Sequence, residues 1–160
     1  MRMTLNDLDI VARFTKTRPP ALATLGGAVT GWDAGAERIT IECRSLTDHC
    51  HSIEGHPKGG IVQGGFITGW LDAAMAHACV AKSGFTVGVP SLEIKVSFLR
   101  PAHPGIVYRA HGWITRWARR ISFMEAELLD PDDVVIARAS STAALTHLPT
   151  NSGEGATQAG

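Results

Sequence analysis

Residues 64–82 carry the strongest helical pattern in the chain. Apolar residues recur there at intervals of three and four positions: Phe66, Ile67, Trp70, Leu71, Ala74, Met75 and Ala78. A shorter amphipathic helix is predicted over residues 6–14, with Asn6 as its N-cap and Pro19-Pro20 ending it. The long segment is the better candidate for the centre of the fold.

Six strands are predicted around the long helix. Two precede it, at about residues 23–32 and 38–46, and a loop rich in His, Gly, Ser and Pro follows over residues 47–60. After the helix the period changes to two: Leu92, Ile94, Val96 and Phe98 share one face of a strand, and Glu93, Lys95 and Ser97 share the other. Further strands are expected near residues 106–117, 120–130 and 134–146, with Trp113 and Trp117 on one face.

Short turns between the last strands predict an antiparallel sheet. A single long helix must lie on one face of that sheet if both apolar surfaces are to be buried. We therefore expect an α+β fold in which a curved antiparallel sheet of about six strands wraps one central helix. The expected domain covers residues 1–148, and residues 149–160, rich in Gly, Ser, Thr and Ala, read as a disordered tail.

Composition narrows the classes of function. The 160 residues include 15 basic and 15 acidic side chains, and this balance does not favour nucleic-acid binding. Three cysteines without CxxC spacing indicate reduced thiols, and no leader-like or membrane-length apolar run is seen, so a cytoplasmic protein is expected. His49, His51 and His56 lack a companion set of ligands with zinc-like spacing; we read them as solvated and expect no metal and no cofactor.

Asp72 is the one charged residue between Ile61 and Ala81. Its neighbours three and four positions away cannot form an ion pair with it, and a carboxylate on an apolar helix costs stability unless something compensates. A functional carboxylate is one interpretation. A carboxylate that caps a backbone amide or reaches solvent is the other.

Residues 59–65, GGIVQGG, form a glycine-rich start to the same helix. Amides at a helix N-terminus carry partial positive charge, and glycine allows another group to approach closely. A carbonyl placed there would be polarised and its developing oxyanion stabilised. Glycine-rich helix starts also arise for steric reasons, so the signal gains weight only from Asp72 further along the helix.

Four segments resemble one known family. Residues 60–76, GIVQGGFITGWLDAAMA, resemble the signature of the PaaI-type branch of hotdog thioesterases. Residues 90–102 (PSLEIKVSFLRPA), 118–130 (ARRISFMEAELLD) and 136–145 (IARASSTAAL) resemble strands that follow in that family. The resemblance covers about residues 24–146, and the order of the four segments makes it specific.

The resemblance implies a hotdog fold and hydrolysis of a small or aromatic acyl-CoA. Asp72 matches the family's general base or nucleophile, Gly64 matches the amide that polarises the thioester carbonyl, and Ser91 matches a hydroxyl that helps to orient water. The family also implies a homodimer or a homotetramer built as a dimer of dimers, with active sites at the dimer interface. Neither a membrane nor a nucleic acid is implied as a partner.

The sequence departs from the family pattern at two positions. Gln63 stands where many relatives have His, and Pro57 stands where many have Asn. Gln63 can still donate a hydrogen bond but cannot act as an acid or base. Gly65 and His56 are further candidates for substrate contact, and His56 is the candidate to replace the missing Asn.

Arg100, Arg119 and Arg120 are candidates for the phosphates of coenzyme A, because guanidinium groups suit phosphate. Two other functions stay open from sequence alone. One is a dehydratase or hydratase acting on acyl thioesters, which usually needs a His paired with a carboxylate. The other is a hotdog domain that binds acyl-CoA without catalysis.

Overall fold

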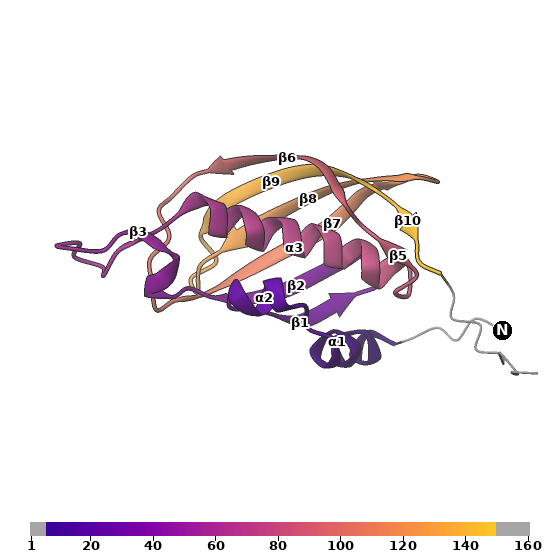
Figure 1. Ribbon diagram of the computed structural model, residues 1–160, viewed down its shortest axis with the longest axis horizontal. Coiled ribbons are helices and arrows are strands. Elements are labelled where there is room, and N and C mark those ends of the chain that lie inside the picture. The colour runs from indigo at the N-terminus through magenta and orange to yellow at the C-terminus, as the bar shows by residue number, and fades with distance from the viewer. Residues whose placement is uncertain (1–5, 150–160) are drawn as a thin grey trace, which may run out of the picture.

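The computed structural model describes residues 6–149 and places one long helix against a curved sheet (Figure 1). The helices are α1 (Asp7–Lys16), α2 (Pro20–Thr24) and α3 (Gly64–Lys82), with a 3-10 turn, η1 (Thr47–His49). The main sheet contains β1 (Gly27–Asp33), β2 (Arg38–Arg44), β6 (Ser91–Phe98), β7 (Val107–Trp117), β8 (Ile121–Leu129) and β9 (Val135–Ala144). Two short pairs join β3 (Cys50–Ser52) to β4 (Ile61–Val62) and β5 (Val87–Gly88) to β10 (Thr146–His147).

The main sheet has the strand order β1-β2-β7-β8-β9-β6, and every neighbouring pair is antiparallel. Helix α3 lies across one face, in contact with the central strands β2, β7, β8 and β9 (Figure 1). This is the predicted α+β arrangement, and it is the hotdog fold. Because β6 is a terminal strand of the sheet, one of its edges has no pairing strand within residues 6–149.

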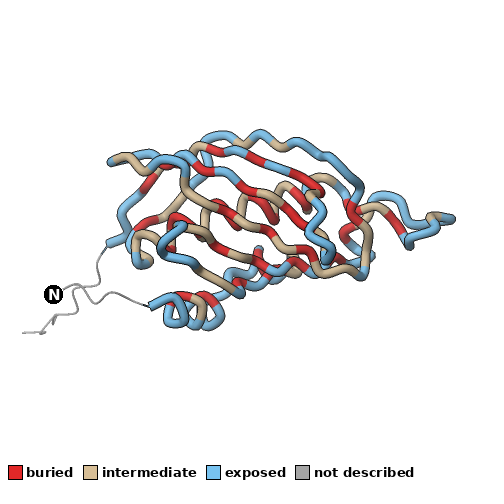
Figure 2. The backbone as a smooth tube through the Cα atoms, turned by 180° about the vertical axis from the view of Figure 1, so that it is seen from behind, coloured by how far each residue is buried: buried red, intermediate tan, exposed pale blue. Residues whose placement is uncertain are grey.

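The core forms where α3 meets the sheet, as the red segments of Figure 2 show. The apolar side of α3 is fully buried at Trp70, Leu71, Ala74, Met75 and Ala78. Facing it, the strands alternate buried and exposed residues, so that β8 buries Ser122, Met124, Ala126 and Leu128 in turn. The buried residues thus recur every second position in the strands and about every 3.6 positions in the helix, and both sets meet at one interface.

Gly112 on β7 marks the closest approach of sheet and helix. A Cβ atom at this position would lie 2.4 Å from the backbone carbonyl carbon of Ala74 on α3. Such an atom would meet backbone, which cannot rotate away as a side chain can. The absence of a side chain at Gly112 therefore sets how closely α3 packs.

The N-terminal segment differs in part from the prediction. Asn6 does cap α1, and its side chain and that of Asp9 form a reciprocal capping box. The helix ends at Lys16, before the prolines, and Pro20 begins α2 instead of ending α1. The strand expected from residue 23 therefore starts later, at Gly27, because proline is favoured in the first turn of a helix.

Two further predictions need correction. The expected loop over residues 47–60 contains η1 and β3. Trp113 and Trp117 do not share a face, because a bulge between Ile114 and Arg116 inserts an extra residue: Trp113 lies opposite Glu125 on the outer face, and Trp117 opposite the buried Ser122.

Residues 1–5 at the N-terminal end of the predicted domain lie outside the described residues, whereas its C-terminal end at residue 148 lies within them. Of the tail expected at 149–160, residues 150–160 lie outside the described residues, and the domain boundaries stay a prediction. None of the helices within residues 6–149 is both long enough and apolar enough to cross a membrane.

We expect Gly112→Ala to lower the free energy of unfolding by about 2–3 kcal/mol or more, because the new methyl group would force α3 away from β7. Denaturant unfolding measures this change. Gly31→Ala is the matched control in the same sheet: its Cβ would meet Thr40 at 3.4 Å, an ordinary contact. That variant should stay within about 1 kcal/mol of the parent protein. Equal stability of the two variants would contradict the packing argument.

Candidate active site

Asp72 lies midway along α3 on the side that faces the terminal strand β6. Ser91, the first residue of β6, donates a hydrogen bond from Oγ to Oδ1 of Asp72 at 2.6 Å. Within residues 6–149, Asp72 takes part in no ion pair and caps no backbone amide. The structure thus brings together two of the residues that the resemblance connects, and it holds the carboxylate at the margin of the sheet.

Gln63 organises the N-terminus of α3. Its side-chain Oε1 accepts a hydrogen bond from the backbone amide of Gly65 at 2.6 Å, and its own backbone N–H donates to the carbonyl of His49 at 2.8 Å. The amide of Gly65 is therefore occupied. The Nε2 atom of Gln63 is left as the donor that a ligand could use.

The backbone amide of Gly64 is the first of the helix and has no acceptor among the described residues. It belongs to the set of N-terminal amides that an α-helix cannot satisfy internally. The ring of Phe98 lies directly beside Gly64, 3.0 Å from where a Cβ atom would be. Gly64 therefore combines a free donor with an apolar neighbour.

A cavity of about 400 Å³ adjoins Gly64. Most of its wall is apolar, from Ile61, Val62, Ile67, Phe98, Leu99 and Ala102. The alternating pattern predicts Phe98 on the apolar face of its strand, but nothing in the local sequence indicates that it contacts the helix start. The sequence shows two adjacent apolar residues, Phe98 and Leu99, at the end of a predicted strand. It does not show which part of the fold they contact.

The loop histidines differ from one another: His51 is exposed, as expected for a solvated side chain, whereas His56 is half-buried and His49 is not solvated. His49 is buried, receives the amide of Leu46 at Nδ1, donates from Nε2 to the carbonyl of Thr24 and stacks on Phe66 with ring centroids 4.4 Å apart. His56 lies before the glycine turn, with its ring centroid 5.5 Å from that of His103. Within residues 6–149, no three side chains of the types that bind metals lie close enough together to hold an ion.

The three candidate arginines do not form one cluster. Arg100 lines the cavity beside Gly64, where its Nη1 donates to the carbonyl of Val135 at 2.6 Å. Arg119 and Arg120 lie in the turn between β7 and β8, beyond Trp117, whose ring is 5.7 Å from Nζ of Lys82 at the other end of α3. A helix of 19 residues spans about 27 Å, and this length separates the two ends within one chain.

Gly64 and Asp72 are also well separated. Eight residues along an α-helix correspond to about 12 Å. An oxyanion donor works at about 3 Å from the oxygen, and an attacking atom approaches within about 3.5 Å of the carbonyl carbon. The two groups of one chain therefore cannot act on the same carbonyl.

Burial changes the ionisation of groups near the site. The Nδ1 atom of His77 donates to the carbonyl of Ala73 at 2.7 Å, and its ring packs against that of Phe14. Burial lowers the pKa of His77, an effect that the hydrogen bond and the charge of Asp72 only partly oppose. Burial also raises the pKa of the Cys79 thiol to about 11 and raises that of Cys43 further, so neither is a ready nucleophile.

Comparison with known proteins gives a consistent result. Residues 59–137 match the family model of the thioesterase superfamily. A solved protein from that superfamily is 26% identical over 86% of this chain and 96% of its own, with a TM-score of 0.71. The phenylacetic acid degradation-related protein of Ralstonia eutropha JMP134 is 25% identical over 84% of this chain and 98% of its own, with a TM-score of 0.70. The PaaI protein of E. coli shares the fold, with a TM-score of 0.69; it is 15% identical over 86% of this chain and 91% of its own. None of the curated proteins matches.

The lowered pKa of His77 predicts acid sensitivity. The folded protein binds fewer protons at this site than the unfolded chain, so the free energy of unfolding should fall as the pH drops below the ordinary value of 6.5. His77→Gln removes the group and should flatten that slope in denaturant titrations between pH 7 and 5. His111, whose pKa burial also lowers, would keep a residual slope. The exposed His147→Gln is the control, and an equal slope in His77→Gln and the parent would refute the assignment.

Proposed function

This chain belongs to the thioesterase superfamily, and on that premise we propose that it hydrolyses an acyl-CoA to the free acid and coenzyme A. The observation that most directly supports this proposal is the hydrogen bond between Ser91 and Asp72 at the edge of the sheet formed by β6. A carboxylate held there by a hydroxyl, with no cation to neutralise it, is available to activate water or to attack a carbonyl.

Each group has a distinct role in the proposed reaction. The carbonyl oxygen of the thioester accepts a hydrogen bond from the amide of Gly64, and Nε2 of Gln63 is a second donor within the same helix start. On one route Asp72 takes a proton from water as the water oxygen bonds to the carbonyl carbon; the C–S bond breaks, and the coenzyme A thiolate takes that proton from Asp72. On the other route the carboxylate of Asp72 attacks the carbonyl carbon, the coenzyme A thiolate leaves, and water then cleaves the acyl–aspartyl anhydride, which releases the acid, regenerates Asp72 and supplies the proton for the thiolate. Ser91 orients the carboxylate or the attacking water.

The separation of Gly64 from Asp72 requires two subunits for one site. A carbonyl bound at Gly64 of one subunit needs a carboxylate that its own α3 cannot supply within about 12 Å. The carboxylate is therefore the partner subunit's Asp72. A homodimer is the smallest assembly that meets this requirement.

Strand β6 provides a route to that homodimer. Its Phe98 end lies beside Gly64, and its Ser91 end lies beside Asp72. If a second β6 pairs antiparallel along the free edge, the partner's Ser91 end comes to lie beside Phe98. This pairing would bring the partner's Asp72 toward Gly64 and create two equivalent sites.

The surface along β6 supports this assembly. Leu92 is 62% exposed, Phe98 53% and Leu99 51% in the single chain. Large exposed apolar side chains beside an unpaired strand edge favour association of a monomer, because the free N–H and C=O groups of such an edge can pair with another strand. Pairing of two β6 strands would cover both the edge and these side chains.

Substrate contacts follow from the walls around Gly64. The apolar cavity of about 400 Å³ suits a small or aromatic acyl group or the pantetheine arm, and Arg100 at its rim suits a phosphate. Gly65 and His56 lie at the same end of the molecule as further contacts. Arg119 and Arg120 could contribute only from a second subunit, given their distance from Gly64 in the same chain.

Loss of the carboxylate should abolish most of the hydrolysis. We expect Asp72→Asn, which keeps the shape and can still bond to Ser91, to reduce kcat by about 100-fold or more. Release of free thiol from a panel of short, long and aromatic acyl-CoAs measures the rate. Asp132→Asn, in an exposed hairpin turn, should keep the full rate. Tight acyl-CoA binding without turnover by the unmodified protein would instead favour a binding domain.

The donor at the helix start can be removed without loss of the helix. Gly64→Pro deletes the amide N–H at the first helical position, where proline is favoured, and Gln63 already has the extended backbone that precedes proline well, with φ −68° and ψ 136°. We expect kcat to fall by about 100-fold. Gly64→Ala is the matched control: it adds the same Cβ beside Phe98 but keeps the N–H, and should retain far more activity.

Mixed dimers test whether the site is shared. Asp72→Asn and Gly64→Pro chains, co-expressed with different tags and purified as heterodimers, would contain one site with both defects and one intact site. Activity should return to about half that of the parent dimer. Inactive heterodimers would show that both groups act within one chain.

A further inference from the structure

One buried histidine holds the start of α3 from outside the helix. His49, the last residue of η1, is 3% exposed. Its backbone carbonyl accepts the N–H of Gln63, the N-cap of α3, at 2.8 Å. Its ring stacks on Phe66 in the first turn, with centroids 4.4 Å apart and 25° between the planes. His49 therefore contacts the residues on both sides of Gly64 and Gly65.

The hydrogen bonds of the His49 ring fix which of its nitrogens carries the proton. The backbone N–H of Leu46 donates to Nδ1 at 3.2 Å, so Nδ1 must be an acceptor. A neutral ring then carries its proton on Nε2, which lies 3.2 Å from the carbonyl of Thr24 and donates to it. The N–H of His49 donates to the carbonyl of Leu46 at 3.0 Å. One residue thus satisfies both backbone groups of Leu46 and closes η1.

The same ring rests on the end of α2. A helix cannot satisfy its last carbonyl groups internally. Nε2 of His49 donates to the carbonyl of Thr24, and Nε1 of Trp70 donates to that of Leu25 at 2.7 Å. Trp70 is a fully buried residue of α3. The end of α2 is therefore anchored to the body of α3, and it provides a fixed support for His49.

The helix start needs such a support because it contains few side chains. Gly64 and Gly65 have none to pack, and the turn before them contains Gly59 and Gly60. Glycine leaves the backbone more freedom than any other residue. The direction of the Gly64 N–H is thus determined by the residues that flank the pair, and His49 contacts both of them.

We propose that His49 is a positioning residue for the groups that polarise the thioester carbonyl. Its catalytic consequence rests on the proposed hydrolysis, in which His49 touches no substrate and acts through Gln63 and Phe66. These two residues determine where the N–H of Gly64 and Nε2 of Gln63 point. Donors to a developing oxyanion are effective only when they are already aimed at the oxygen, so a loosened helix start slows the chemical step.

The hydrogen bonds of His49 can be removed while its ring packing is kept. His49→Phe retains an aromatic ring against Phe66 but leaves the N–H of Leu46 and the carbonyl of Thr24 without partners. We expect kcat to fall about tenfold with KM changed less than about twofold, because the misplaced donors act mainly in the transition state. His49→Gln can place an amide nitrogen near the site of Nε2 and should recover most of the loss. Thiol release from acyl-CoA measures both variants.

A double-mutant cycle separates positioning from a general loss of stability. In Gly64→Pro chains the principal donor is absent, so His49→Phe should reduce kcat there by only about threefold or less. A variant that was merely less folded would lose the same factor in both backgrounds. The second donor, Nε2 of Gln63, accounts for the loss that remains.

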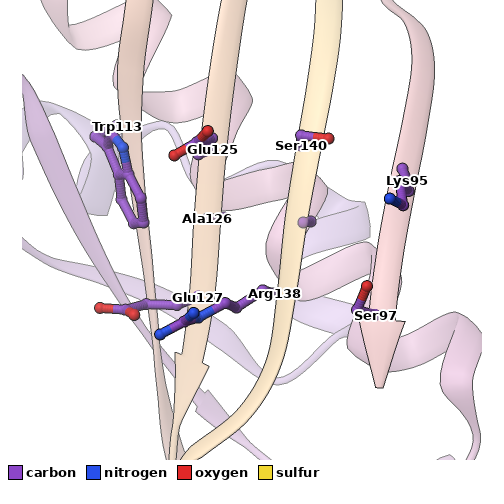
Figure 3. A pocket seen from close by; sticks show the side chains of 9 residues that line it. Lys95, Ser97, Trp113, Glu125, Ala126, Glu127, Arg138 and Ser140 are labelled. Atoms are coloured by element: carbon purple, nitrogen blue, oxygen red, sulfur yellow. The ribbon is translucent and has the colours of Figure 1, made fainter. Parts of the chain in front are cut away.

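Two variants control for changes that leave the helix start alone. Ile10→Ala empties a buried position in α1, which packs against β1. Glu125→Gln changes an exposed side chain at a hollow of about 410 Å³, beside Trp113 and Arg138 on the face of the sheet turned away from α3 (Figure 3). Both should keep the parental kcat, although Ile10→Ala lowers the free energy of unfolding.

Nuclear magnetic resonance tests the positioning without any substrate. In the parent protein, the ring nitrogen spectrum should show the proton of His49 on Nε2. In His49→Phe, hydrogen exchange should become faster at the amides of Gln63 and Gly65, while the amide of Met75 in the middle of α3 stays protected.

Three results would overturn the proposal. One is unchanged exchange at Gln63 and Gly65 in His49→Phe, and another is a proton on Nδ1 of His49. The third is an equal loss of kcat in both backgrounds of the cycle. If the parent protein releases no thiol from any acyl-CoA, the proposed hydrolysis fails, and the exchange rates still decide whether His49 holds the helix start.

Discussion

The close contact between α3 and β7 governs the rest of this molecule. Gly112 lets the strand come within reach of the helix backbone at Ala74, and on either side of that point the helix presents only apolar surface to the sheet. A charged residue on that surface would lose its hydration without a partner. The only charge in the middle of α3, Asp72, therefore lies on the side where the sheet ends, beside the first residue of β6.

For the proposed hydrolysis, this placement would link catalysis to assembly. The half-buried carboxylate at the margin of the sheet has a hydroxyl partner, and the helix start carries, about 12 Å away, an amide without an acceptor among residues 6–149. The strand that borders both groups, β6, has exposed apolar side chains and an edge that no strand of the described chain pairs with. One event, the pairing of that edge, would satisfy the backbone, cover the apolar surface and bring a donor and a carboxylate from different subunits to one carbonyl. A single chain would contain both the amide donor and the carboxylate, but the two groups would be too far apart to form a complete site.

The sequence predicted the parts of the fold that depend on local periodicity. The bounds of α3 agree with residues 64–82, and the bounds of the four main-sheet strands after it differ from the predicted ones by at most two residues, because their patterns are long and regular. Helix α2 was missed because five residues cannot display a helical period. The faces of Trp113 and Trp117 were misassigned because one inserted residue reverses every side chain beyond it, and nothing in the local sequence marks the bulge.

The candidate site, like the fold, was predictable from the sequence only in part. Asp72 stood out as a lone charge, but its contact with Ser91 spans 19 positions, and the resemblance named Ser91 only as a hydroxyl that helps to orient water. The position of Phe98 beside Gly64 depends on how β6 crosses the helix.

Gln63 is a departure from the family pattern that fits the proposed reaction. The resemblance leads us to expect a titratable histidine at this position, whereas here the side chain is a neutral amide. Its Oε1 is engaged with the Gly65 amide, which fixes the orientation of the group and turns Nε2 into a donor. That donor keeps its proton at every physiological pH, as the backbone amide of Gly64 does. In the proposed reaction, the group that polarises the carbonyl is therefore made of neutral dipoles at a helix N-terminus, and the proton transfer that hydrolysis needs is left to the carboxylate of Asp72.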